Sequence, residues 1–280
     1  MEKHPNKYSE PNMFKQRLFT ALILIPIVLG GLYYANSWVI KCVALLALIG
    51  SAIEWQQLIP LKGRAAPLVF FTLLILATTV VPPVFNIWLI VGLGTWALIC
   101  MALIRFPQSQ TIWGYPAIVA GFALILLPLF AESLVLITQE SHGKVFLVTL
   151  LFMVWGADTG GYVIGKMFGH HHLIPQVSPG KTIQGTMGGA LFSLIVAAIS
   201  FTYLPFEPQQ RHLWFAMTIF VFFMALIGDL FISMLKRRVH IKDTGTLFPG
   251  HGGVLDRLDS LIAAAPAFYF GLHWIRQGAL

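Results

Sequence analysis

The chain is dominated by apolar runs that are long enough to cross a lipid bilayer. A transmembrane helix needs about 20 consecutive, mainly apolar residues. The composition, with 57% hydrophobic and 10% charged residues, lies far outside the range of soluble domains. The sequence therefore predicts an all-α, polytopic integral membrane protein with about nine transmembrane helices. The predicted spans are residues 18–35, 38–58, 67–82, 86–105, 113–138, 144–166, 183–204, 212–235 and 258–276.

The basic residues predict the orientation of these spans. With the N-terminus in the cytoplasm, most of the 18 lysines and arginines face the cytoplasm, as the positive-inside rule requires. These residues are Lys3, Lys7, Lys15, Arg17, Lys62, Arg64, Arg105, Lys166, Lys181, Lys236, Arg237, Arg238, Lys242 and Arg257. The net charge of +7 is thus explained by topology and by contact with anionic lipid headgroups, and we expect no nucleic-acid partner.

The organisation of the chain follows from this topology, because no segment is left over for a soluble domain. We divide it into an N-terminal region, 1–143, with about five transmembrane helices, and a C-terminal transmembrane region, 144–280. The two longest polar connections, 167–182 and 236–257, both belong to the second region and both face the cytoplasm.

The residues from 233 to 259 form a polar stretch that combines cations, carboxylates and glycines. Cations neutralise phosphate oxygens, carboxylates hold Mg²⁺, and glycines let backbone N–H groups approach a ligand closely. The stretch therefore favours phosphate and metal chemistry. Its members are Lys236, Arg237, Arg238, Lys242, Asp243, Gly245, Gly250, Gly252, Gly253, Asp256, Arg257 and Asp259.

Asp229 and Asp256 stand where two successive spans meet the cytoplasmic surface. Two carboxylates brought together repel each other unless a cation lies between them, and Mg²⁺ is the usual cation beside a phosphate substrate. Asp259 follows Asp256 by three residues and so shares its helix face. The alternative interpretation is a set of salt bridges at the membrane surface.

The other cytoplasmic loop contains the segment Ser-Pro-Gly-Lys-Thr at 178–182. A Walker A loop is excluded, because the first glycine of that motif and its preceding strand are missing. Ser178, Lys181 and Thr182 can nevertheless bind a phosphate at the start of the next helix. The histidines at 170–172 are interpreted as a solvated cluster, whereas His251 is a better candidate for phosphate contact.

Three further carboxylates lie within or near the ends of predicted spans. Asp158 has two open interpretations, a polar contact between helices that pack through small residues or a member of the site. Glu54 and Glu132 stand alone near span ends, and both are interpreted as interfacial carboxylates.

The terminal polar stretch resembles the phosphatidate cytidylyltransferase (CDP-diacylglycerol synthase) family. The matching positions are Ser233, Lys236, Arg237, Lys242, Asp243, Gly245, His251, Gly252, Gly253, Asp256, Arg257 and Asp259. A second matching segment contains Asp158, Gly165, Lys166, Ser178, Pro179, Lys181, Thr182 and Gly185. The chain departs from many family members at Gly180 and Gln184, which affects single contacts and not the reaction.

The resemblance implies that CTP and phosphatidic acid react to give CDP-diacylglycerol and pyrophosphate in phospholipid biosynthesis. It implies a bacterial inner-membrane enzyme with its site facing the cytoplasm, membrane lipids as partners, and a homodimer. It also implies Mg²⁺ held by Asp229, Asp256 and Asp259, and leaves a second cation open. The implied catalytic residues are Asp229, Asp256, Lys181 and Lys236. The implied substrate-binding residues are Lys166, Ser178, Lys181, Thr182, Lys236, Arg237, Lys242, His251 and Arg257.

Two alternatives are kept beside this interpretation. Another CTP-dependent lipid enzyme, such as a polyprenol kinase or an ether-lipid cytidylyltransferase, needs similar phosphate chemistry and differs in its products. An ion-coupled transporter could use Asp158 and Asp229 as a coupling pair. It would turn over no nucleotide, and it would leave the cytoplasmic lysines and glycines unexplained.

Overall fold

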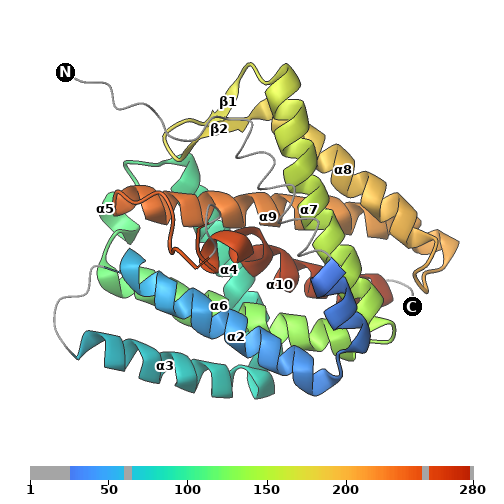
Figure 1. The fold of residues 1–280 in the computed structure, drawn as a ribbon, viewed down its shortest axis with the longest axis horizontal. Coiled ribbons are helices and arrows are strands. Elements are labelled where there is room, and N and C mark those ends of the chain that lie inside the picture. Colours follow the sequence, from blue (N-terminus) through green and yellow to red (C-terminus); the bar gives the residue numbers. More distant parts are fainter. Residues whose placement is uncertain (1–25, 60–64, 248–251, 278–280) are drawn as a thin grey trace.

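The computed structural model describes residues 26–59, 65–247 and 252–277, and most of them belong to helices (Figure 1). Residues 26–34 are helical and precede the first numbered helix. The elements that follow are α2 (Ser37–Leu58), α3 (Ala66–Val80), η1 (Pro82–Val84), α4 (Phe85–Ile104), α5 (Gln110–Trp113), α6 (Pro116–Gln139), α7 (Gly143–Phe168), β1 (His172–Ile174), β2 (Ser178–Thr182), α8 (Ile183–Phe201), η2 (Pro208–Gln210), α9 (Arg211–Arg238) and α10 (Leu255–Gln277).

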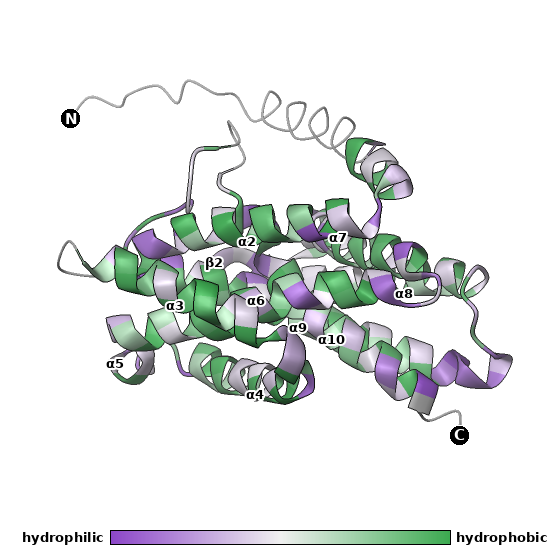
Figure 2. Ribbon diagram, turned by 90° about the horizontal axis from the view of Figure 1, so that it is seen from below, coloured by the Kyte–Doolittle hydropathy of each residue, from purple (hydrophilic) through white to green (hydrophobic). Residues whose placement is uncertain are grey.

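Within the described residues, 6 helices are long and apolar enough to cross a membrane, and α3 is a shorter apolar helix. Figure 2 shows that apolar residues predominate along α2, α3, α4 and α6. Many of these side chains point outward: Leu46 is 68% exposed and Ile90 is 72% exposed. A soluble protein rarely exposes such continuous apolar surface, so these helices are suited to lipid contact. The helical membrane class is confirmed.

The predicted spans from 38–58 onward each coincide with one helix, with ends that differ by a few residues. Much of the first predicted span, 18–35, lies outside the described residues. The count of nine, the cytoplasmic N-terminus and the division at residue 143 therefore stay predictions. Buried side chains from both predicted regions contribute to one hydrophobic core.

The loop predicted at 167–182 contains a short hairpin, which the sequence interpretation did not foresee. Strands β1 and β2 pair antiparallel, with His172 opposite Thr182 and Ile174 opposite Ser178. The chain reverses direction here between α7 and α8, and the backbone pairing satisfies N–H and C=O groups that a bare loop would leave open. The hairpin thereby fixes the position of Lys181, which lies in β2.

Helices α7 and α8 pack backbone to backbone through glycines. A Cβ atom on Gly160 would lie 2.6 Å from the carbonyl oxygen of Gly188. A Cβ atom on Gly185 would lie 2.7 Å from the carbonyl oxygen of Gly161. Small residues allow this close approach in membranes, where packing and not the hydrophobic effect drives helix association. The packing places the C-terminal half of α7 directly against the hairpin and the start of α8.

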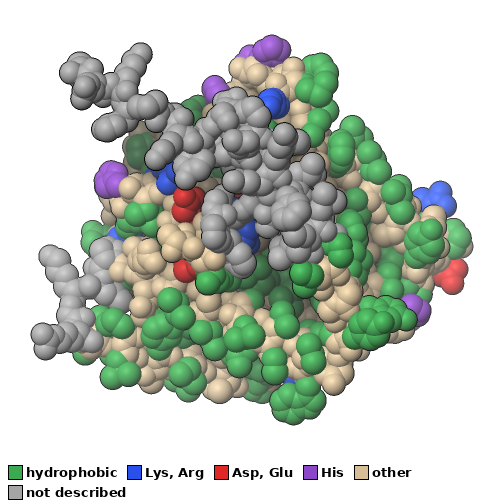
Figure 3. Space-filling view, viewed as in Figure 1, with side chains coloured by type: hydrophobic (Ala, Val, Ile, Leu, Met, Phe, Trp, Pro, Cys, Tyr) green, Lys and Arg blue, Asp and Glu red, His purple; other side chains and the backbone are tan. Residues whose placement is uncertain are grey.

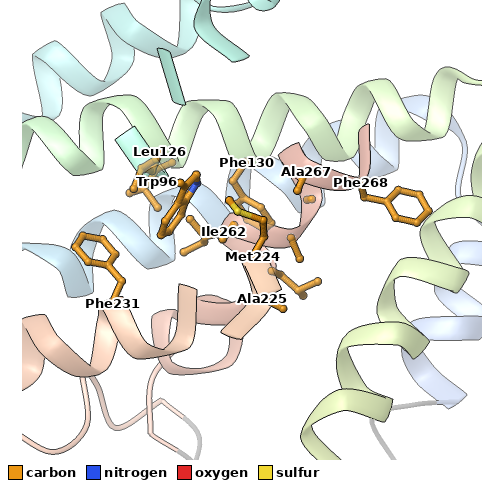
Figure 4. Packing of buried hydrophobic residues seen from close by; sticks show 14 of the residues in the cluster. Trp96, Leu126, Phe130, Met224, Ala225, Phe231, Ile262, Ala267 and Phe268 are labelled. Carbon is orange, nitrogen blue, oxygen red and sulfur yellow. The ribbon is translucent and has the colours of Figure 1, made fainter. Parts of the chain in front are cut away.

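The core lies where α4, α6, α9 and α10 meet (Figure 4). Phe231 of α9 is fully buried there. Its ring centroid lies 5.6 Å from that of Trp96 and 5.3 Å from that of Phe122, both in edge-to-face geometry. Such aromatic pairs add to the free energy gained by burial alone. This packing fixes the rotation of α9 about its axis, and with it the direction of Asp229.

Candidate active site

A cleft of about 230 Å³ opens between α7, β2, α8, α9 and α10. Its polar lining includes Asp158, Lys181 and Ser260, and its apolar lining includes Phe222 and Leu226. Figure 3 shows hydrophobic side chains covering the lower part of the face over α2 and α3, with acidic and basic side chains above them. In the cleft itself, Asp158 and Lys181 lie beside an apolar wall that includes Phe222 and Leu226.

Lys181 pairs with Asp229 at this cleft, which links the hairpin to α9. Burial acts to lower the pKa of Lys181, but the carboxylates of Asp229, Asp158 and Asp259 outweigh burial and raise the pKa above its usual value. The ammonium group therefore carries its charge at neutral pH. The structure thus brings together one cation and three carboxylates from four different elements.

The three carboxylates are close enough to repel one another. Asp158 of α7 feels the charge of Asp229, and Asp259 of α10 feels the charges of both. Arg257 exerts an attraction on Asp158 from the first turn of α10. Asp158 lines the cleft, and its membership of the site stays a prediction.

Glycine packing explains why Asp229 and Asp259 are neighbours. A Cβ atom on Gly228 would overlap the carbonyl oxygen of Asp259, so α9 and α10 touch at this point. Farther along, Gly271 of α10 lies against Met217 of α9. The contact lies later on α10 where it lies earlier on α9, so α9 and α10 are antiparallel neighbours.

The chemistry of this carboxylate group fits a hard divalent cation. Mg²⁺ prefers carboxylate oxygens, and a cation between repelling carboxylates lowers their mutual repulsion. Within the ranges that the structure describes, no three His, Cys, Asp or Glu side chains converge as a ready-made metal cage. The donor set therefore fits Mg²⁺ in charge and kind, with Lys181 as the cation among the carboxylates in this structure.

Asp256 belongs to a different set of contacts. Its Oδ1 atom lies 2.6 Å from the Nζ atom of Lys236. Its Oδ2 atom accepts hydrogen bonds from the backbone N–H groups of Thr244, at 2.7 Å, and Gly253, at 3.0 Å. Asp256 and Lys236 are both 9% exposed. In this structure Asp256 thus anchors the chain before α10, whereas Asp229 contacts Lys181.

Gly252 has the backbone conformation that this arrangement requires. Its φ angle is +81°, in the region that glycine adopts without strain. A Cβ atom here would also lie 2.6 Å from the Oδ2 atom of Asp256. Gly252 therefore allows close packing around a buried carboxylate.

Glu54 of α2 is a member of the same set, and its interpretation as an interfacial carboxylate is wrong. The residue is 7% exposed and accepts hydrogen bonds from Val254 N at 2.7 Å and Leu255 N at 2.8 Å. It also accepts one from the hydroxyl of Thr244 at 2.8 Å. The signal that could have found it is the carboxylate itself, since a charge near a span end needs a partner.

Helix α8 begins where the sequence predicted, but some of the N–H groups at its start already donate hydrogen bonds within the protein. Thr182 is the N-cap residue, and its Oγ1 atom accepts a hydrogen bond from Gly185 N at 3.1 Å. The N–H group of Ile183 donates to the carbonyl oxygen of His171 at 2.8 Å. Lys181 points to Asp229, while Ser178 is half-buried in β2. The phosphate cradle at 178–182 stays a prediction.

The remaining predicted site residues that the structure describes are not among those that line the cleft. Lys166 lies over the ring of Tyr162 at 5.8 Å, and Arg237 donates from Nε to the carbonyl oxygen of Val177 at 3.2 Å. Lys242 and Arg257 are exposed, and His251 lies outside the described residues.

The histidine cluster at 170–172 is exposed, as predicted. Gln184 of α8 ties it to the helix: its Oε1 atom accepts from His170 N at 3.2 Å and from His171 N at 3.3 Å. This residue, where the chain departs from many family members, therefore has a structural contact that the sequence did not reveal.

The fold and the cleft define a polytopic helical membrane protein that gathers acidic and basic side chains beside an apolar wall. A family model described as the cytidylyltransferase family matches residues 15–275, and the chain belongs to this family. The protein is therefore a membrane-embedded nucleotidyltransferase.

Relatives from several bacteria cover most of the chain. A phosphatidate cytidylyltransferase of Pseudomonas aeruginosa is 36% identical over 265 residues, which are 91% of this chain and 96% of the relative. One of Haemophilus influenzae is 32% identical over 92% of this chain and 98% of its own length. One of Synechocystis is 31% identical over 91% of this chain and 95% of its own length.

Proposed function

We propose that the protein is a phosphatidate cytidylyltransferase, which transfers CMP from CTP to phosphatidic acid. A phosphate oxygen of the lipid forms a bond to the α-phosphorus of CTP, and the bond to the β-phosphate breaks, so that CDP-diacylglycerol and pyrophosphate are released. The observation that carries this proposal is the cleft itself, where Lys181 and Asp158 lie near Phe222 and Leu226. A water-soluble nucleotide and a lipid phosphate can both reach such a boundary. The names of the relatives support the same assignment.

The residues of this chain contribute positioning and charge neutralisation, which dominate the catalysis of phosphoryl transfer. Lys181 has three N–H donors on its ammonium group, so it can contact Asp229 and a phosphate together. Arg257 and Lys242 are exposed on the adjoining stretch and add positive charge for the triphosphate. Lys166, Ser178 and Thr182 are proposed as further contacts to the substrates.

We propose that the reaction depends on Mg²⁺. Asp229 and Asp259 would hold the ion, because α9 and α10 touch where these two residues stand. Asp158 would lie beside them, since it lines the same cleft as Lys181, the partner of Asp229. Asp256 remains a proposed ligand, and Lys236 neutralises its carboxylate in this structure. When bound, the ion would offset charge on the phosphate oxygens and on the pyrophosphate leaving group.

The proposal includes an orientation in the membrane. We propose about nine spans, a cytoplasmic N-terminus and a site that faces the cytoplasm of a bacterium, in its inner membrane. The excess of lysine and arginine on one side supports this orientation. A homodimer is proposed on the family resemblance alone.

The experiment is a turnover assay with purified protein, CTP, phosphatidic acid in mixed micelles and Mg²⁺. Pyrophosphate release should require both substrates and should disappear on chelation of the metal. Release that is independent of phosphatidic acid would contradict the proposed acceptor. Formation of CDP in place of pyrophosphate would indicate a kinase.

A further inference from the structure

The carboxylate of Glu54 accepts three hydrogen bonds from residues before and at the start of α10. Its two carboxylate oxygens accept from Val254 N, Leu255 N and the hydroxyl of Thr244, at 2.7, 2.8 and 2.8 Å. Two of these donors stand at the beginning of α10, where backbone N–H groups have no partner inside the helix. A carboxylate from α2 therefore caps the helix that carries Asp256 and Asp259.

Thr244 connects Glu54 directly to Asp256. The Oγ1 atom of Thr244 lies 2.8 Å from Oε2 of Glu54 and 3.0 Å from Oδ2 of Asp256, so its single proton lies within reach of two buried carboxylates. The N–H group of the same residue donates to Asp256 at 2.7 Å. The direction of the Asp256 side chain thus depends on a residue that Glu54 holds.

Two glycines leave room for this carboxylate. Cβ atoms on Gly245 and on Gly253 would both overlap the Glu54 side chain. The backbone on either side of the 246–252 segment therefore passes directly against α2. The contact reaches across 200 residues of sequence, from Glu54 to Val254.

We propose that Glu54 is a positioning residue for the reaction, and that it sets the place of Asp256 and the first turn of α10 through Thr244, Val254 and Leu255. This inference rests on the proposed function. Glu54 acts through other residues and touches no reacting atom in the proposal. Hydrogen bonds from buried N–H groups to a carboxylate are stronger than bonds between neutral groups. Glu54 therefore holds Val254 and Leu255 firmly in place.

The substitution Glu54→Gln tests this role because it keeps the shape of the side chain. The amide nitrogen of glutamine is a donor, so it would face one of the three donors that now point at the carboxylate. We expect kcat to fall at least tenfold, and the Mg²⁺ concentration for half-maximal rate to rise, while KM for phosphatidic acid changes less than threefold. Glu54→Asp keeps the charge and should recover more of kcat than Glu54→Gln.

Glu132→Gln is the matched control. Glu132 lies on α6, 16 residues from the helix start at Pro116, or about 24 Å along the axis. That start lies near the ends of α2 and α9, because Arg238 donates to the carbonyl oxygens of Leu58 and Gly114. The control is thus the same chemical change far from the site, and its kcat should stay within twofold of wild type.

A second measurement separates positioning from the reaction itself. Hydrogen–deuterium exchange of the backbone covering 253–255 should be faster in Glu54→Gln than in wild type, and unchanged in Glu132→Gln. Thr244→Val should give the same faster exchange, and the double variant should be no worse than either single one. If wild type fails to turn over CTP, the proposed function fails, whereas the exchange data still decide the role of Glu54. A well-folded Glu54→Gln protein with wild-type exchange, kcat and Mg²⁺ dependence would overturn the inference.

Discussion

The Nζ atom of Lys236 lies 2.6 Å from the Oδ1 atom of Asp256, and both side chains are almost completely buried. The pair joins the last turn of α9 to the first turn of α10. Removing one partner of a buried pair leaves a charge without compensation, which costs about 3–5 kcal/mol. This pair therefore ties the stability of the helix junction to a residue of the proposed site.

Lys236→Met should lower the stability of the protein and its turnover together. We expect the free energy of unfolding to drop by up to about 3–5 kcal/mol, because Asp256 loses its cation. Thermal unfolding in detergent measures this, with Lys242→Met as the control, since Lys242 is exposed. Equal unfolding temperatures for the two variants would show that the Lys236–Asp256 pair does not hold the junction.

Asp229→Asn and Asp259→Asn should both raise the Mg²⁺ concentration needed for half-maximal rate and reduce kcat by roughly a hundredfold or more. An amide keeps the shape and removes the charge that a hard cation needs. Both residues serve one centre, so the double variant should be no slower than either single one. A metal titration of initial rates makes this measurement. Normal Mg²⁺ dependence in either single variant would remove that residue from the proposed metal site.

Lys181→Met should reduce kcat/KM for CTP by roughly ten- to a hundredfold, since a hydrogen bond to a charged group contributes about 1.5–3 kcal/mol. The thermal unfolding temperature should change little, because the Lys181–Asp229 pair is partly exposed, with 28% and 23% of the two side chains accessible. Steady-state kinetics and a thermal scan on the same preparation test both parts. Unchanged kinetics would confine the site to the stretch around α10.

Gly188→Ala should destabilise the contact between α7 and α8. The added Cβ atom would lie 2.5 Å from the side chain of Ile164 and 2.8 Å from the carbonyl oxygen of Gly160, so the helices must move apart. Overpacking of this kind typically costs about 1–3 kcal/mol. Gly121→Ala is the control, because a Cβ atom there meets nothing within 4 Å. If both variants unfold at the same temperature, the glycine contact does not determine the packing.

The spans could be predicted from the sequence because each one is a run of consecutive apolar residues, which can be recognised without knowledge of its neighbours in space. The predicted spans from 38–58 onward correspond to helices. The antiparallel packing of α9 on α10 follows from their being successive spans, since successive spans cross the membrane in opposite directions. The hairpin of β1 and β2 could not be predicted, because its pairing is short and lies in a stretch rich in Pro and Gly with no alternating pattern.

The site was only partly predictable, because its contacts join residues that are distant in sequence. The pattern of charges led to the prediction of Asp229, Asp256 and Asp259 as site residues, but it could not show that Asp229 contacts Lys181 while Asp256 contacts Lys236. Glu54 was misinterpreted because its partners lie about 200 residues away. Only the packing of α2 against the chain before α10 reveals that contact.

The most direct measurement of the central claim follows the α-phosphorus of CTP. Purified protein is incubated with phosphatidic acid, Mg²⁺ and CTP that carries a radiolabel at the α-phosphorus, and in a parallel reaction at the γ-phosphorus. The account predicts that the α-label enters the chloroform-soluble lipid, and that the γ-label appears as pyrophosphate in water in equal amount. Transfer of the γ-label to lipid, or no transfer of either label, would contradict it.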